Sequence, residues 1–187
     1  MKEGEILIDI ARTERDLEQI MSLQLLNHKM SLNAQERKSN GFVTLKHELK
    51  QLKKMMASAP QVVARCGDEI VGFALVLLKE QSDMFPILQP MFDLFDETEY
   101  EGRLLGETDY YVMGQVCIEA NYRGQGIFHQ LYEEHKRLLS SRFEHCLTEA
   151  SIHNKPSMRA HEKVGFITIK EYSDHTDDWA MLLWDWT

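Results

Sequence analysis

The chain has 187 residues, of which 43% are hydrophobic and 27% charged, and its 21 Lys and Arg against 30 Asp and Glu give a net charge of −9. At about 150 residues per domain, this length predicts a single domain over residues 1–187. The acidic balance argues against nucleic acid as a partner, because such affinity comes from Lys and Arg at phosphates, and it would suit a cationic small molecule.

The apolar runs and the cysteines bear on cellular location. The longest runs, such as residues 70–78, are well short of the roughly 18 to 20 residues that span a bilayer, and the N-terminus lacks a signal-peptide core. We therefore expect a cytoplasmic protein without membrane contact. The three cysteines form no CxxC pair and cannot all be bridged, which fits a reducing compartment. They are expected to be buried small hydrophobes: Cys66, Cys117 and Cys146.

Patterns in the first 60 residues predict one strand and two helices. Residues 5–11 alternate polar and apolar, which is typical of a strand. Thr13, with Asp16 three residues on, predicts a helix start. The apolar stripe of that helix comprises Leu17, Ile20, Met21 and Leu25. Thr44 is expected to cap a second helix, whose apolar side comprises Leu45, Leu49, Leu52 and Met56.

The middle of the chain predicts a hairpin followed by an insertion. Residues 61–65 and 70–79 are β-branched, apolar runs joined by Cys-Gly-Asp-Glu, which indicates antiparallel strands. Residues 81–107, between the third and fourth strands, are too long for a tight turn and too apolar for a plain linker. They form either a short helix beside the sheet or a wall of a substrate pocket.

The second half alternates strands and helices. A strand over residues 109–119 leads through a glycine turn into a helix ending near Ser141, and a strand over 146–151 follows. Residues 153–164 predict a helix with Pro156 in its first turn and Gly165 just past its end. Two strands, 166–172 and 179–184, close the chain. The order β-α-α-β-β-β-α-β-α-β-β predicts a mixed fold of the α/β or α+β class.

The glycine turn is the first candidate binding motif. In the run from Arg123 to Gly126, glycines let the backbone approach a bound group, and the unpaired amides and positive dipole end of the following helix face outward. This combination predicts a phosphate cradle, to which Arg123 could add a charge-assisted contact. It is not a Walker loop, since no Gly-Lys-Ser/Thr follows, and it lacks the three glycines of a dinucleotide fingerprint.

A second motif runs from Asn154 to Phe166 and reads NxxSxxxHEKxGF. Together with the preceding strand and YRGxGI, it resembles the GNAT family of N-acetyltransferases, which use acetyl-CoA to acetylate amines. The resemblance is specific for residues 116–166, and the element order extends it over nearly the whole chain. It implies a single GNAT-like domain with a mixed, mostly antiparallel sheet flanked by helices on both faces.

The resemblance also implies which residues bind acetyl-CoA. In the family, the strand matching residues 115–119 offers backbone groups to the pantetheine arm, and amides matching residues 123–127 hold the pyrophosphate. Asn154 matches a residue that hydrogen-bonds the cofactor. The residues expected to bind the cofactor are Val116, Cys117, Ile118, Arg123, Gly124, Gln125, Gly126, Ile127, Asn154 and Ser157.

Two residues are implied in catalysis. Glu149 matches the glutamate that serves as base in related enzymes acting on ribosomal-protein N-termini, and an acceptor amine must lose its proton before it attacks. His161 matches the tyrosine that often protonates the departing thiolate. Either residue could instead be a structural group. Rival acid-base candidates on or beside the preceding strand are Glu107, Asp109, Tyr111 and Glu119.

The chain departs from the family at the glycine motif. That pattern begins with Gln or Arg and ends with Gly or Ala, whereas this chain has, depending on register, Asn121 at its start or Phe128 at its end. We expect no metal, because the group of histidines and carboxylates has no recognised ligand spacing. Its members are His129, Glu133 and His145.

The resemblance of the two motifs to the family implies direct acetyl transfer, without an acyl-enzyme, to the primary amine of a small or amino-acid-like acceptor. A peptide N-terminus is the alternative acceptor, and a non-catalytic CoA-binding or interaction module is the alternative class. A homodimer is a further expectation. Exposed tryptophans would mark its contact, although burial in strands explains them better: Trp179, Trp184 and Trp186.

Overall fold

The computed structural model of the protein describes residues 4–28, 30–31, 43 and 45–187. Within these residues, a seven-stranded sheet has the strand order β1-β2-β3-β6-β7-β9-β8. Its strands are β1 (Ile6–Ile10), β2 (Val62–Cys66), β3 (Glu69–Leu77), β6 (Tyr110–Ile118), β7 (His145–Ser151), β9 (Asp178–Asp185) and β8 (Ile167–Ser173). Only the described pair β6–β7 runs parallel, so the sheet is mixed and mostly antiparallel, as predicted.

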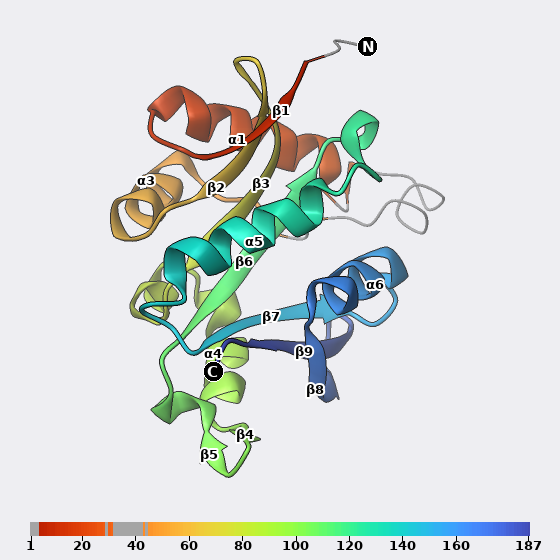
Figure 1. The fold of residues 1–187 in the computed structure, drawn as a ribbon. Helices are drawn as coiled ribbons and strands as arrows, with labels where there is room; N and C mark the ends of the chain where they lie inside the picture. Colours follow the sequence, from red (N-terminus) through yellow and green to blue (C-terminus); the bar gives the residue numbers. More distant parts are fainter. Residues whose placement is uncertain (1–3, 29, 32–42, 44) are drawn as a thin grey trace.

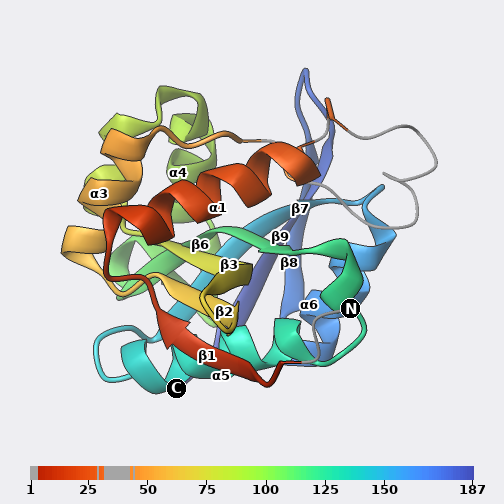
Figure 2. The ribbon, with the colours of Figure 1, turned by 90° about the horizontal axis from the view of Figure 1, so that it is seen from above.

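Helices cover both faces of the sheet (Figures 1 and 2). On one face lie α1 (Glu14–Asn27), α3 (Leu49–Ser58) and α4 (Gln89–Asp96), and on the other lie α5 (Ile127–Leu139) and α6 (Lys155–Val164). Successive side chains of each strand point to opposite faces of the sheet. In β3, Phe73 and Leu75 pack on the face covered by α1, α3 and α4. Ala74 and Val76 pack on the face covered by α5 and α6. Burial on both faces explains why β3 is apolar almost throughout.

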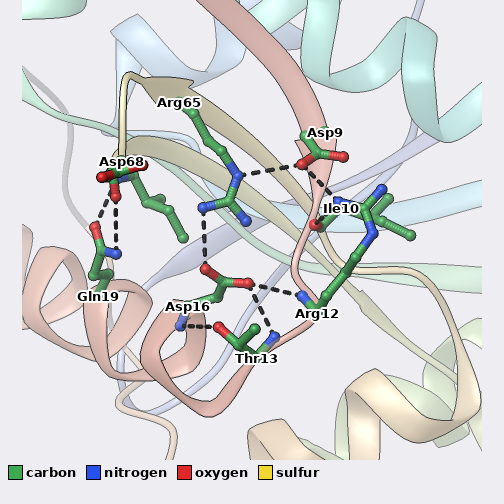
Figure 3. A network of polar contacts seen from close by, with 9 residues as sticks. Asp9, Ile10, Arg12, Thr13, Asp16, Gln19, Arg65 and Asp68 are labelled. Atoms are coloured by element: carbon green, nitrogen blue, oxygen red, sulfur yellow. Dashed lines mark hydrogen bonds and ion pairs between the residues drawn. The ribbon is translucent and has the colours of Figure 1, made fainter.

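An ion-pair cluster of Asp9, Arg12, Asp16 and Arg65, of which Asp16 is buried, fastens α1 to the edge of the sheet (Figure 3). Arg65 of β2 donates from Nη1 to Asp16 Oδ1 at 3.0 Å and from Nε to Asp9 Oδ2 at 3.3 Å. Asp16 Oδ2 accepts from the amides of Arg12 and Thr13. The Thr13 side chain accepts from the Asp16 amide, which completes the predicted capping box.

Two details of the first helices differ from the prediction. Leu17 and Ile20 are buried, but Leu25 is 55% exposed and lies outside the core-facing stripe. The second helix begins at Leu49, with Glu48 as its N-cap, so Leu45 precedes the helix instead of lying on its apolar side. Thr44, the predicted cap, lies outside the described residues. Tertiary hydrogen bonds hold the segment before α3: Gln115 Nε2 donates to Leu45 O at 2.8 Å.

The hairpin β2–β3 forms as predicted, and the insertion after it combines both expected roles. It contains short 3₁₀ turns, α4, and a small two-stranded sheet of β4 (Glu99–Tyr100) and β5 (Arg103–Leu104). Phe92 and Phe95 of α4 are buried in the core, whereas Leu88 and Met91 line a cavity. The insertion is therefore both a helix packed on the sheet and a pocket wall.

The parallel strands β6 and β7 pair over only three residues, from Tyr110 with His145 to Val112 with Leu147. Beyond this point β6 runs on to Ile118 and β7 to Ser151 without pairing to each other. Thr148 Oγ1 donates across the opening to Met113 O at 3.0 Å. The separation leaves one edge of each strand available, and the candidate site lies at this opening.

Several smaller expectations can be compared with the structure. The three cysteines are buried, as predicted. Trp184 is buried and Trp186 packs against the same core cluster, which agrees with the simpler explanation for these tryptophans. Among the described helices, none combines the length and apolar character needed to cross a membrane.

Candidate active site

Two connected cavities occupy the opening between β6 and β7. The larger, called the groove, has a volume of about 760 Å³ and is lined by residues 116–118 of β6, residues 123, 124 and 126–129 around the start of α5, and one face of α6. The smaller, called the inner pocket, has a volume of about 120 Å³ and lies between β6, β7 and α4. Val43, Val116, Asn154 and Ser157 line both, so the two cavities meet at these residues.

The glycine turn gives the groove an amide-rich wall. Gly124 and Gly126 have φ values of 75° and 79°, in the left-handed region that side chains disfavour. Gly126 is the N-cap of α5, and the first bond of the helix runs from Gln130 N to Gly126 O at 3.1 Å. The amides of residues 127–129 thus have no acceptor within the helix. With the positive end of the helix dipole, they fit a phosphate group.

Arg123 and Gln125 flank these glycines with different orientations. Arg123 lines the groove, and its guanidinium donates from Nε to Ile118 O at 2.9 Å and from Nη2 to Asn27 Oδ1 at 2.6 Å. These bonds fix the side chain and leave part of its hydrogen-bonding capacity unused. Gln125 is exposed, donates to Asn121 O at 3.2 Å, and is not part of the groove lining.

The edge of β6 and the start of α6 complete the groove. Val116, Cys117 and Ile118 lie on β6 past the last residue that pairs with β7, so their backbone groups on that edge have no strand partner there. Burial raises the pKa of Cys117 to about 12, which keeps its sulfur a neutral thiol. Asn154 caps α6 by accepting from the Ser157 amide at 3.3 Å.

His161 lies on α6 beside the inner pocket and is 3% exposed. Its Nδ1 is 2.9 Å from Ser157 O, an acceptor, so Nδ1 must carry the proton and donate it. Nε2 then accepts from the Tyr132 hydroxyl at 2.7 Å. Burial lowers the pKa of His161 to about 4, which leaves the ring neutral near pH 7. Tyr132 comes from α5 and was not predicted as a site residue from the sequence. Phe128 of α5 packs edge-on against the His161 ring.

Glu149 lies on β7 beyond the pairing with β6, is largely buried, and lines the inner pocket. Its Oε2 accepts a hydrogen bond from the hydroxyl of Tyr172 on β8. Burial raises the pKa of Glu149, the Tyr172 hydroxyl acts to lower it, and the Asp174 carboxylate adds to the rise. The result is a carboxyl group whose pKa lies above its ordinary range, a property of many catalytic bases. Nothing in the sequence pattern pointed to Tyr172.

The rival acid-base candidates lie elsewhere. Glu107, Asp109, Tyr111 and Glu119 are absent from the described lining of both the groove and the inner pocket. Tyr111 is fully buried on the sheet face covered by α5, where its hydroxyl is 3.3 Å from His135 Nδ1. Among these acid-base candidates in the described part of the chain, Glu149 is the carboxylate that lines the inner pocket.

The outer wall of the inner pocket is apolar and is held by buried amide side chains. Leu45, Leu88 and Met91 contribute this wall. Gln115 of β6, which also lines the pocket, donates to Leu45 O at 2.8 Å and accepts from Gln24 Nε2 at 2.7 Å. Residues from α1, the segment before α3 and β6 are thereby locked together around the pocket.

Metal ligation has no support among the described side chains, where no group of three His, Cys, Asp or Glu residues gathers closely enough to hold an ion. On the surface of α5, His129 Nε2 lies 3.9 Å from Glu133 Oε1. His145 instead packs against Tyr100 beside the small sheet.

Solved structures with the same fold include acetyltransferases from several sources. A structure of the NatC complex bound to Gag peptide and CoA matches with a TM-score of 0.66 and 14% identity, covering 98% of this chain and 99% of that chain. The ribosomal-protein-S18-alanine N-acetyltransferase from Escherichia coli matches with a TM-score of 0.62 and 12% identity, covering 97% and 94%. Arabidopsis thaliana NAA60 in complex with acetyl-CoA matches with a TM-score of 0.62 and 16% identity, covering 97% and 99%.

The protein therefore shares the mixed α/β fold of these solved acetyltransferases. The sequence pattern of the acetyltransferase (GNAT) family matches residues 27–166, well over half of the chain. The chain belongs to this family. Among curated proteins, none matches the chain in sequence.

Proposed function

We propose that the protein is an acetyl-CoA-dependent N-acetyltransferase that transfers the acetyl group directly to the primary amine of a small, amino-acid-like acceptor. The observation that carries this proposal is the meeting of two unlike cavities at Val116, Asn154 and Ser157. One cavity ends in amides suited to phosphate, and the other contains a carboxylate suited to an amine. A donor and an acceptor entering from the two sides would meet at the shared residues.

The chain's own residues fit acetyl-CoA, which supplies an activated acetyl thioester when bound. The amides of residues 127–129 and the Arg123 guanidinium suit its pyrophosphate. The free edge of β6 at residues 116–118 suits the amide groups of its pantetheine arm. Asn154 and Ser157 offer polar groups where the cavities meet.

Glu149 is the proposed base. An amine with a pKa near 10 arrives mainly as ammonium and must lose a proton before it can attack. The raised pKa of the Glu149 carboxyl brings it closer to the working pH, which favours proton acceptance. The Tyr172 hydroxyl holds the carboxylate in place.

The expected role of His161 as a direct proton donor needs a modification, because both of its ring nitrogens are engaged by Tyr132 and Ser157. We assign His161 to fixing the first turn of α6 through Ser157 O. The Ser157 Oγ lies 3.3 Å from His161 Nδ1 and belongs to the lining of both cavities. Its hydroxyl is the proposed hydrogen-bond donor to the departing sulfur.

The inner pocket supports a compact acceptor. Its volume of about 120 Å³ and its wall of Leu45, Leu88 and Met91 suit an amine with a short apolar body. A peptide N-terminus is the second candidate, favoured by the match to a structure with a bound peptide and to an enzyme named for an alanine of a ribosomal protein. Such a peptide would place its first residue in the same pocket.

A thiol-release assay with acetyl-CoA tests the proposal. The panel contains free amino acids, short apolar amines, and peptides that begin with the same residues. We expect release with at least one small amine and a lower kcat/KM for the matching peptides. Release with peptides alone would replace the small acceptor by the peptide alternative. CoA binding without release across both panels would favour the non-catalytic module.

Wider expectations about domain organisation, location and partners belong to the same proposal. We propose that residues 1–187 act as one domain, in the cytoplasm, without a nucleic-acid or membrane partner. A homodimer remains a prediction, which sedimentation of the full chain at several concentrations would check.

A further inference from the structure

The groove carries positive charge in a protein that is acidic overall. Arg123, Arg159 and Lys163 line it, and none of its described lining residues is Asp or Glu. Since the whole chain has 30 acidic and 21 basic residues, this gathering of cations points to an anionic ligand. The inner pocket has the opposite character, with Glu149 and no Lys or Arg in its described lining.

Arg159 and Lys163 form a pair on α6. They are four residues apart and so lie on the same face of the helix, which lines the groove. Both are exposed, and neither side chain makes an ion pair or hydrogen bond with another described residue. Arg123 differs, because Ile118 O and Asn27 already bind its guanidinium. The pair on α6 therefore offers unused charge and unused donors to a ligand in the groove.

On the basis of the proposed binding of acetyl-CoA, we propose that Arg159 and Lys163 form a subsite for the phosphate monoester on the ribose of CoA. Through this subsite the protein would select CoA over its dephosphorylated form. The amides at the start of α5 suit the diphosphate bridge, which leaves the monoester without cations of its own. A phosphate monoester carries a charge of about −1.5 to −2 at pH 7, and Arg and Lys both bind such groups well.

Calorimetric titration with CoA and with 3′-dephospho-CoA tests this subsite without relying on turnover. The proteins compared are the wild type, Arg159→Gln, Lys163→Gln and the double variant. The matched control is Lys155→Gln, which makes the same charge change at an exposed position of α6 outside the groove lining. Thermal unfolding without ligand confirms that each variant is folded.

The wild type and the control are expected to bind CoA about tenfold more tightly than dephospho-CoA, equivalent to about 1.4 kcal/mol. The double variant is expected to bind both ligands with the affinity that the wild type has for dephospho-CoA. Equal wild-type affinity for the two ligands would overturn the subsite. If the double variant bound CoA and dephospho-CoA more weakly by the same factor, the subsite would also be overturned, because Arg159 and Lys163 would then act on the diphosphate that both ligands carry. If neither ligand bound the wild type, the proposed function would fail, and the subsite with it.

Discussion

Two carboxylates, the buried Asp16 in the ion-pair cluster and the half-buried Glu149 in the inner pocket, have opposite surroundings. Asp16 accepts from the Arg65 guanidinium and from two backbone amides (Figure 3). Burial acts to raise its pKa, but these hydrogen bonds outweigh burial and lower the pKa below its ordinary range. Glu149 accepts from Tyr172, faces a cavity, and has a raised pKa.

This difference separates a structural carboxylate from a candidate catalytic one. A buried charge whose oxygens are fully hydrogen-bonded stabilises the fold through its partners and has no free position for a ligand. A buried carboxyl with one side open to a cavity can accept a proton from a ligand there. Substitution of Asp16 should therefore affect stability without affecting chemistry, and substitution of Glu149 should do the reverse.

The largest expected effect is the loss of stability in Asp16→Ala. Removing the Asp16 carboxylate takes from Arg65 one of its two carboxylate partners and from two backbone amides their acceptor, which should lower the free energy of unfolding by about 3 kcal/mol. Chemical denaturation at pH 7 measures this loss, and kcat should stay near that of the wild type. The control is Glu14→Ala, since Glu14 pairs with Lys53 at the surface and the loss should be about 0.5 kcal/mol or less.

The Asp16 effect should also depend on pH. Because folding lowers the pKa of Asp16, its contribution is complete above the unfolded value near 3.9 and declines as the pH falls toward the folded value. The stability difference between wild type and Asp16→Ala should therefore shrink below about pH 4. A difference that stayed constant down to pH 2 would show that the carboxylate charge contributes nothing.

Next in size is the loss of rate in Glu149→Gln. Removing a general base costs roughly 100-fold or more in kcat, whereas CoA affinity should be unchanged. Because folding raises the pKa of Glu149, keeping its carboxylate charged at pH 7 lowers the stability of the folded wild type. Glu149→Gln carries no such charge, so this variant should be at least as stable as the wild type at pH 7. The control is Glu162→Gln at an exposed position of α6. Wild-type turnover in Glu149→Gln would remove this residue from the base role.

The smallest effect concerns Tyr172→Phe. Losing the hydroxyl removes the hydrogen bond that lowers the pKa of Glu149, so that pKa should rise further. The acid limb of the kcat/KM profile should move to higher pH by about one unit, the value of one hydrogen bond to a charged group. Tyr100→Phe, which loses a similar bond to Asp185, is the control and should leave the profile in place. An unshifted limb in Tyr172→Phe would mean that the hydroxyl does not tune Glu149.

The sequence predicted features that depend on local chemistry. Thr13 and Asp16 form the capping box at the start of α1, and Gly165 follows the last residue of α6, both as predicted from residues a few positions apart. Contacts made through tertiary packing were not predictable in this way. Tyr132 and Tyr172 are 29 and 23 residues from the site residues that they hydrogen-bond.

The start of α3 shows the same limit. The helical pattern favoured a start near Thr44, but long-range hydrogen bonds hold the preceding segment outside the helix. Gln115 binds Leu45 O, and Gln24 Oε1 accepts from His47 N at 3.3 Å. Local propensity therefore predicted the presence of α3 correctly but placed its N-terminus before Leu49, where the helix begins.

Amide NMR during a titration with CoA will determine whether the amides that open α5 bind the cofactor's diphosphate. We expect saturable shifts that are largest at residues 124–129, with smaller shifts at residues 116–118. Absence of binding, or shifts confined to residues outside the groove, would contradict it.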